Sequence, residues 1–133
     1  MSKRLRRCFH CPAELTFHLL GGKWRVVVVA QLESRAMRYS ELRRAVPELS
    51  DKVLAATLRE LESLGIIVRT SLNWPLEPVP IGLYRLSAKG RALRPMLTLA
   101  AAWARAHAAE YGIRFLNGQP RRGPDTVDAE LSH

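Results

Sequence analysis

Residues 38 to 61 read Arg-Tyr-Ser-Glu-Leu-Arg-Arg-Ala-Val-Pro-Glu-Leu-Ser-Asp-Lys-Val-Leu-Ala-Ala-Thr-Leu-Arg-Glu-Leu, and this stretch decides the fold. Each half has a hydroxyl residue suited to cap a helix, Ser40 in the first and Ser50 in the second, and Pro47 ends the first half. In the second half the apolar residues recur at the spacing of one helical face: Val53, Leu54, Leu58 and Leu61. The pattern predicts two short helices joined by a tight turn.

The faces left over by these apolar positions are basic or small. Such a helix pair is typical of a helix-turn-helix, whose second helix enters the major groove of DNA. The residues predicted to contact DNA from the two helices are Ser40, Arg43, Arg44, Ser50, Lys52, Ala55, Ala56 and Arg59.

These residues are expected to play different parts. Lys52, near the start of the second helix, is placed to reach a guanine edge or a phosphate, whereas Ala55 and Ala56 offer only apolar contact to thymine methyl groups. The hydroxyl of Ser50 and the two arginines of the first helix suit backbone phosphates. Arg59 is expected to contact a phosphate or a base. For each of the arginines, Arg43, Arg44 and Arg59, a second interpretation stays open: an exposed charge, or a pair with an acid of the same chain such as Glu60 or Glu62.

The charge balance favours a polyanionic partner. The 133 residues hold 21 Lys and Arg against 12 Asp and Glu, a formal net charge of +9. Neutralising phosphates releases their condensed counterions, so a small basic protein suits double-stranded DNA. Lys3, Arg4, Arg6 and Arg7 have no acidic neighbour and read as a basic arm.

After Gly65 the pattern changes from helix to strand. Residues 66–70 and 82–86 are both strand-like, and the segment 71–80 between them contains three prolines. Two strands joined by a projecting loop, directly after a helix-turn-helix, indicate a wing. Arg69, Asn73 and Arg85 are predicted to contact the minor groove or its flanking phosphates.

Helices are also predicted on both sides of this region. Residues 13–20 follow Pro12, which suits a first helical turn, while the valine-rich segment 23–32 fits either a strand or a buried helix. Ser87 is expected to cap a long helix reaching about Tyr111, which Pro95 bends or begins. An apolar stripe on that helix fits either a core face or a dimer seam, and the seam is favoured: Leu93, Leu97, Ala100, Ala101, Ala104 and Ala108.

The fold class expected is mainly α with a small β-hairpin, a winged helix-turn-helix with terminal dimerisation helices. Its parts are a basic arm at 1–10, the domain with its flanking helices at 11–112 and a poorly ordered tail at 113–133. The sequence has no membrane-spanning run, signal peptide or catalytic motif, so a cytoplasmic protein without enzymatic activity or cofactor is expected.

Cys8 and Cys11 form the one cluster where reactive chemistry is expected. Three interpretations remain open. Nearby Arg6, Arg7 and a helix N-terminus favour the thiolate and hence a redox-sensing thiol that responds to an oxidant or electrophile. In the second interpretation the two cysteines supply half of the four ligands of a zinc site, together with His10 or His18. In the third they are inert residues that only pack.

The chain resembles the HxlR-type winged-helix regulators, which are related in fold to the MarR group. The motifs that carry the resemblance are Cys11-Pro12, Leu20-Gly21-Gly22-Lys23-Trp24, Tyr39 to Arg44, Val46-Pro47, Ser50 to Leu54, Leu58 to Leu61, Gly65, Pro78-Val79-Pro80, Tyr84-Arg85-Leu86 and Gly90. The resemblance implies a transcriptional regulator, a buried helix for the valine-rich segment, a homodimer formed by the terminal helices and a sensing role for Cys11.

Three departures from the family pattern bear on the function. Asp51 stands where Gln is usual, Ala55 and Ala56 stand where polar residues are usual, and Ile81-Gly82-Leu83 replaces an Arg-Val-Glu run. The expected function is a homodimeric regulator on a palindromic operator, switched by thiol chemistry. The alternatives are a regulator that responds to a small ligand and a winged-helix module that binds only protein.

Overall fold

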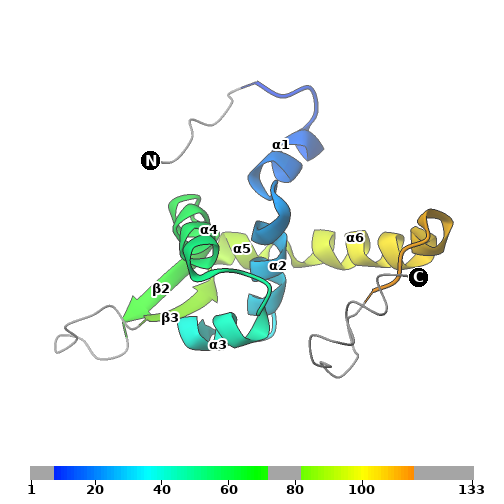
Figure 1. Cartoon of the computed structure of the whole chain (residues 1–133). Helices are drawn as coiled ribbons and strands as arrows, with labels where there is room; N and C mark the ends of the chain where they lie inside the picture. The colour runs from blue at the N-terminus through cyan, green and yellow to red at the C-terminus, as the bar shows by residue number, and fades with distance from the viewer. Residues whose placement is uncertain (1–7, 72–81, 116–133) are drawn as a thin grey trace. The chain divides into compact units, whose positions relative to one another are not determined.

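The computed structural model describes residues 8–71 and 82–115 of a chain that divides into two compact units, Met1–Leu97 and Thr98–His133. In chain order the elements are α1 Pro12–Leu19, α2 Lys23–Leu32, β1 Met37–Arg38, α3 Tyr39–Ala45, α4 Asp51–Ser63, β2 Ile67–Ser71, β3 Gly82–Leu86, α5 Ala88–Arg91, α6 Arg94–His107 and the 3-10 helix η1 Ala108–Tyr111 (Figure 1). The predicted fold class, mainly helical with a small sheet, is confirmed.

The antiparallel sheet has the strand order β1-β3-β2. In the hairpin, Ile67 pairs with Leu86 and Arg69 with Tyr84, so the two predicted strands are confirmed. The third strand, β1, pairs Met37 with Tyr84 on the other edge of β3. This strand is only two residues long, too short for an alternating pattern to reveal it in the sequence.

The core of the first unit forms around the inner face of α4. Leu54, Leu58 and Leu61 are buried there, and α2 contributes Val28 and Val29, both with no exposed surface. The valine-rich segment is therefore a helix, as the family resemblance implies. Burial of these side chains outweighs the β propensity of valine, because propensity scales span only ~1 kcal/mol.

The ends of α4 match the sequence pattern. At its start, the Val53 amide donates to Ser50 Oγ at 3.2 Å, which confirms Ser50 as the N-cap. At its end, Gly65 has a positive φ of 74°, and the Gly65 and Ile66 amides donate to the carbonyls of Glu62 and Leu61. This pair of hydrogen bonds is a Schellman motif, which favours glycine at that position.

Ser40 is not the N-cap of the preceding helix, so that prediction is wrong. The N-cap is Arg38, two residues earlier, and α3 begins at Tyr39. The Arg38 amide donates to Glu41 Oε1 at 3.0 Å, so an acid in the first turn, and not a serine hydroxyl, provides a side-chain hydrogen bond at the start of the helix. The Arg38 amide and the ion pair with Arg35 hold the pKa of Glu41 below its usual value.

The helix predicted after Ser87 is interrupted by a turn, so of the two alternatives for Pro95 the structure supports the one in which this residue marks the first turn of the long helix. Ser87 Oγ accepts from the Gly90 amide at 3.0 Å and caps the short α5, but α6 starts anew at Arg94. Pro95 falls in the first turn of α6, where its missing N–H costs no hydrogen bond. Gly90 lies so close to β2 that a Cβ there would stand 2.2 Å from the carbonyl oxygen of Ile66. No helix among the described residues is long and apolar enough to cross a membrane.

Replacing Leu54 by Ala should lower the free energy of unfolding by ~2–5 kcal/mol, because the side chain is fully buried and its loss leaves a cavity. The sequence pattern also predicts its neighbour Val53 on the buried face, and this prediction is wrong, because the side chain of Val53 is 38% exposed; Val53→Ala therefore serves as the control. Urea unfolding of both variants measures the difference. Equal destabilisation by the two substitutions would contradict the position assigned to α4.

Candidate nucleic-acid interface

The described segment 39–63 forms two helices with a turn between them. α3 and α4 flank the turn, and Leu42, Val46 and Leu49 are buried beneath it. The apolar anchors of the turn fix the inner faces of both helices, so their remaining faces are directed to solvent. This arrangement is the helix-turn-helix that the sequence predicts.

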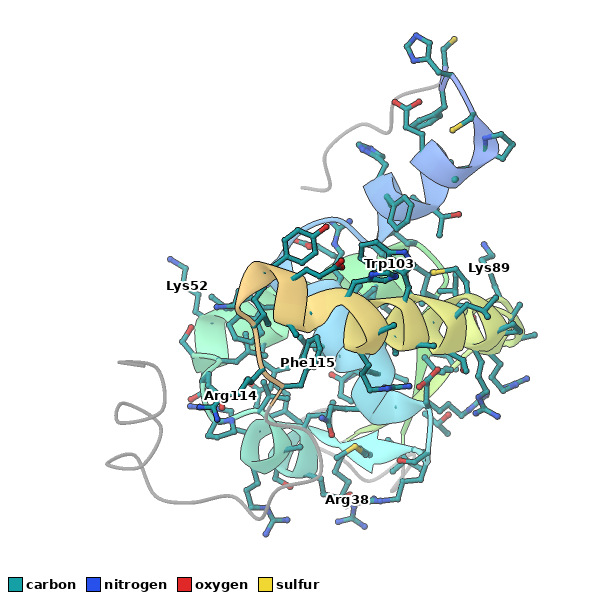
Figure 2. The ribbon with its side chains drawn as sticks, turned by 90° about the vertical axis from the view of Figure 1, so that its right-hand side faces the viewer. Arg38, Lys52, Lys89, Trp103, Arg114 and Phe115 are labelled. Carbon is teal, nitrogen blue, oxygen red and sulfur yellow. The ribbon has the colours of Figure 1, made fainter. Side chains whose placement is uncertain are left out.

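The outward face of α4 carries the predicted base-reading residues. Lys52 and Arg59 are exposed, and Ala55 and Ala56 are half-buried. Helical spacing places Lys52, Ala56 and Arg59 on the side opposite Leu54 and Leu58. In Figure 2 the side chain of Lys52 projects away from the ribbon. The face combines two long cations with short apolar side chains and has few hydrogen-bonding groups for a base edge.

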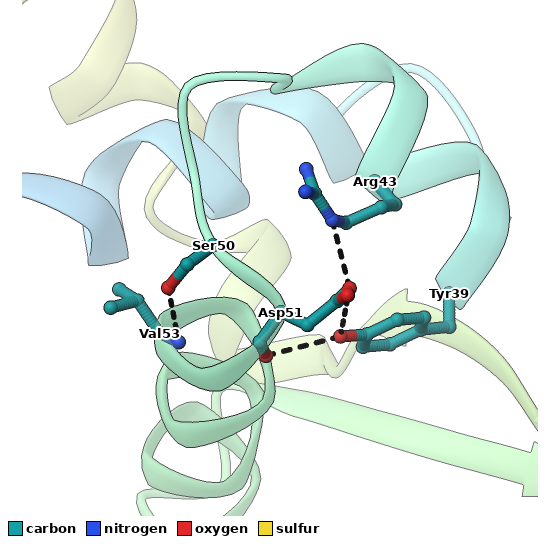
Figure 3. A network of polar contacts seen from close by, with 5 residues as sticks. All are labelled: Tyr39, Arg43, Ser50, Asp51 and Val53. Atoms are coloured by element: carbon teal, nitrogen blue, oxygen red, sulfur yellow. Dashed lines mark hydrogen bonds and ion pairs between the residues drawn. The ribbon is translucent and has the colours of Figure 1, made fainter.

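A polar network joins α3 to the start of α4, as Figure 3 shows. Arg43 Nε donates to Asp51 Oδ1 at 2.8 Å. The Tyr39 hydroxyl lies 3.1 Å from both Oδ1 and the backbone carbonyl oxygen of Asp51. Partial burial and then the hydrogen bond to Asp51 raise the pKa of Tyr39. Asp51, the departure from the family's usual Gln, thus ties the two helices together.

This network changes the expectation for Arg43. The residue is half-buried, and one of its guanidinium nitrogens is committed to Asp51 rather than directed wholly to solvent. Tyr39 and Asp51 were not predicted as site residues, because an acid eight positions after an arginine follows no helical spacing rule. Arg44 and Ser40 lie exposed on the same helix, and Arg38, which carries no sequence signal of its own, is exposed directly before it.

The three residues predicted to contact DNA from the wing have different surroundings in the structure. Arg85 is exposed on β3, whereas Asn73 lies outside the described residues. Arg69 runs along the sheet: an ideal Cβ at Gly82 would come 2.3 Å from its Cγ, so glycine leaves the space that the arginine stem occupies. Arg69 also forms a side-chain hydrogen bond with Tyr84, a residue whose pKa burial raises and Arg69 partly lowers. Arg69 therefore packs within the hairpin as well as bordering the candidate interface.

Both cysteines are free thiols on the surface. Cys11 is the N-cap residue of α1, and Cys8 lies three residues before it, also exposed. Across residues 8–71 and 82–115 the structure shows no group of three His, Cys, Asp or Glu side chains able to hold a metal ion. The zinc interpretation of this cluster is thus without support from geometry.

Each unit also exposes large apolar side chains. In the first unit these are Leu15, at 40%, and Phe17, at 65%, on α1, together with Val26 on α2 and Val53 on α4, at 37% and 38%. In the second unit they are Leu99, Trp103, Tyr111, Ile113 and Phe115. The stripe predicted as a seam is divided, since Leu93 and Leu97 pack against the core of the first unit. The bulky exposed residues of α6 are instead Leu99, 71% exposed, and Trp103, 60% exposed.

Comparisons with known proteins agree with this geometry. A model of HxlR-like helix-turn-helix proteins matches residues 19–111. The HTH-type transcriptional regulator YtcD of Bacillus subtilis is 35% identical over 111 residues, covering 83% of this chain and 86% of that protein. YodB of the same organism, also an HTH-type transcriptional regulator, is 37% identical over 95 residues, covering 71% of this chain and 82% of YodB.

Solved structures give the same result. The redox regulator HypR in its reduced form superposes with a TM-score of 0.67 at 30% identity, covering 74% of this chain and 94% of that one. Reduced YodB of Bacillus subtilis superposes with a TM-score of 0.62 at 36% identity, covering 72% and 92%. The relatives are transcriptional regulators rather than enzymes. The chain therefore belongs to the HxlR-like helix-turn-helix family of DNA-binding transcriptional regulators.

Proposed function

We propose that this regulator binds duplex DNA as a homodimer, with α4 in the major groove and the β2–β3 hairpin beside it. The observation that carries the proposal is the division of α4 into a buried leucine face and an outward face holding Lys52 and Arg59. The excess of nine positive charges supports it, because each phosphate contact adds affinity through counterion release.

The outward face of α4 favours apolar reading of the bases. With α4 in the major groove, the methyl groups of Ala55 and Ala56 would face the base edges, where thymine carries its C5-methyl group. Asp51 is engaged by Tyr39 and Arg43 and so is not expected to accept a hydrogen bond from a base. Lys52 supplies the one long donor near the helix start. Ser50, Arg43, Arg44 and Arg85 are proposed to contact phosphates.

A homodimer is proposed because both ends of the described chain expose apolar surface. α1 exposes Leu15 and Phe17, and α6 exposes Leu99 and Trp103. Leu99 and Trp103, four residues apart, share one face of α6, and an exposed apolar face of this kind is typical of an interface. A two-fold dimer requires a palindromic operator whose half-sites lie about one helical turn, ~10 bp, apart or a multiple of it.

Thiol chemistry is proposed as the switch. Cys11 sits exposed at the N-cap of α1, where its thiol is open to an oxidant or electrophile. HypR, a structural neighbour, is described as a redox regulator, and YodB has structures in quinone-bound and diamide-treated forms. Oxidation of Cys11 to a sulfenic acid, or to a disulfide with Cys8 or a second subunit, would add volume or strain at this end of α1.

Lys52→Ala should weaken binding to a duplex selected by the wild type by ~1–3 kcal/mol, because a base-edge contact is lost. Binding to random duplex should fall much less. Lys89 is also exposed but lies on α5, so Lys89→Ala is the matched control. Fluorescence anisotropy at fixed salt measures the affinities of all three proteins for both duplexes. If Lys52→Ala weakens selected and random binding equally, Lys52 contacts only phosphate.

Trp103→Glu should convert the dimer to a monomer and abolish tight binding to the palindrome, because it places a charge on the exposed apolar face of α6. Ala88→Glu makes the same charge change at an exposed position of α5 and should leave the assembly unchanged. Sedimentation velocity measures the assembly. A wild type that sediments as a monomer would refute the proposed dimer.

Peroxide or quinone treatment of the wild type should change operator affinity about tenfold or more, reversibly on reduction, since ~1.4 kcal/mol of coupling suffices. Cys11→Ser should not respond, because it lacks the reacting sulfur, and Cys8→Ser shows whether the second thiol takes part. Anisotropy titrations before and after treatment give the comparison. An equal response of the wild type and Cys11→Ser would leave Cys11 without a sensing role.

A further inference from the structure

One arginine side chain of α2 contacts two other helices of the first unit, α1 and α4. Arg25 lies in the first turns of α2. Its Nε and Nη2 lie 3.0 Å and 2.9 Å from Oε2 of Glu60, which belongs to α4. Its Nη1 donates to the backbone carbonyl of Leu19, the last residue of α1, at 2.9 Å. Arg25 therefore links the end of α1 directly to the proposed recognition helix.

The chemistry of this junction requires an arginine. The guanidinium is planar and carries its donors in a fixed fork, so the carboxylate of Glu60 and the carbonyl of Leu19 are held in one rigid geometry. The side chain of Arg25 is only 25% exposed. The carbonyl oxygens of the last four residues of a helix have no amide donor within that helix. Leu19 is the last residue of α1, and Arg25 donates to its carbonyl oxygen.

The link matters because, within one subunit, little else fixes α1. In the single chain none of the residues of α1 is buried, and Leu15 and Phe17 are exposed. Leu20, immediately after the helix, is the nearest residue that belongs to the core. A helix held by so few apolar contacts within its own subunit can shift relative to α4, which is fixed by a row of buried leucines.

We propose that Arg25 is a positioning residue that couples α1 to α4, so that a displacement of α1 is transmitted to the recognition helix through Glu60. The coupling rests on the proposed function, in which α1 carries the sensing thiol and α4 contacts DNA. It assigns to Arg25 and Glu60 a regulatory role distinct from DNA contact. Glu60 is suited to this role because it lies on α4 itself, next to the exposed Arg59.

The test begins without DNA and compares two acids on the same helix. Glu60→Ala removes the anchor of Arg25, whereas Glu62→Ala removes an exposed acid two residues further along, with the same change of charge. Hydrogen exchange is measured at the Leu20 and Gly21 amides, which donate to Thr16 and His18 at the end of α1. Glu60→Ala should accelerate their exchange ~3-fold or more, and Glu62→Ala should not.

Two further variants separate positioning from general loosening. Glu60→Gln keeps an acceptor for Arg25 and should restore part of the protection, while Arg25→Gln should lose more of it than Glu60→Ala. Thermal unfolding of each variant identifies any that fails to fold. Glu60 and Glu62 are both exposed residues of α4, so the comparison between their alanine variants holds even if Arg25→Gln unfolds.

The second arm uses a duplex selected by the wild type from a random-sequence pool. Both alanine variants lose one negative charge, so their binding to random duplex should rise alike. Glu60→Ala should lower the ratio of selected to random affinity ~3-fold or more relative to Glu62→Ala, because the recognition helix is less well oriented. The coupling is overturned if Leu20 and Gly21 exchange alike in both variants. A wild type that shows no selective DNA binding overturns the proposed function instead, while the exchange data still decide on the coupling.

Discussion

Burial of Leu54, Leu58 and Leu61 on the inner face of α4 is the constraint on which the rest of the structure depends. These side chains meet the valines of α2 and the first residues of β2, so the rotation of α4 about its own axis is fixed. Once that rotation is fixed, Lys52, Ala56 and Arg59 must lie on the outer side. The composition of the surface proposed to face DNA is thus a consequence of core packing.

Polar contacts then set the orientation of α4 relative to its neighbours. Asp51 joins its start to Tyr39 and Arg43 of α3, Glu60 joins its middle to Arg25 of α2, and the Schellman turn at Gly65 leads into β2. Exposed ion pairs of this kind contribute only ~0–1 kcal/mol each to stability. These contacts matter because they fix the orientation of α4. A rotation of α4 by a fraction of a turn would misplace every base contact proposed for it.

The sequence predicts the parts of this architecture that follow a period or a strong local signal. The apolar spacing in 50–61, the Ser50 cap and the Gly65 stop all predict α4 as it is found. The same logic failed where a local signal competed with its surroundings: Glu41 rather than Ser40 supplies the cap of α3, and a turn at Ala92 and Leu93 interrupts the helix expected after Ser87. The valine-rich helix needed the family resemblance, since propensity alone favours a strand. Contacts between distant residues, such as Arg25 with Glu60 and Leu19, leave no spacing rule in the chain and required the structure.

We propose that the outward face of α4 reads DNA, and that its two alanines recognise thymine methyl groups by apolar contact. The most direct measurement is the affinity of the wild type for its selected duplex with each thymine replaced in turn by deoxyuridine, which removes only the C5-methyl group. The account predicts that affinity falls at the same thymine position in both half-sites, and that phosphate contacts, reported by the salt dependence, stay unchanged. If no single methyl group affects binding, or if the effect is confined to one half-site, α4 does not read the operator in the way that its alanine-bearing face implies.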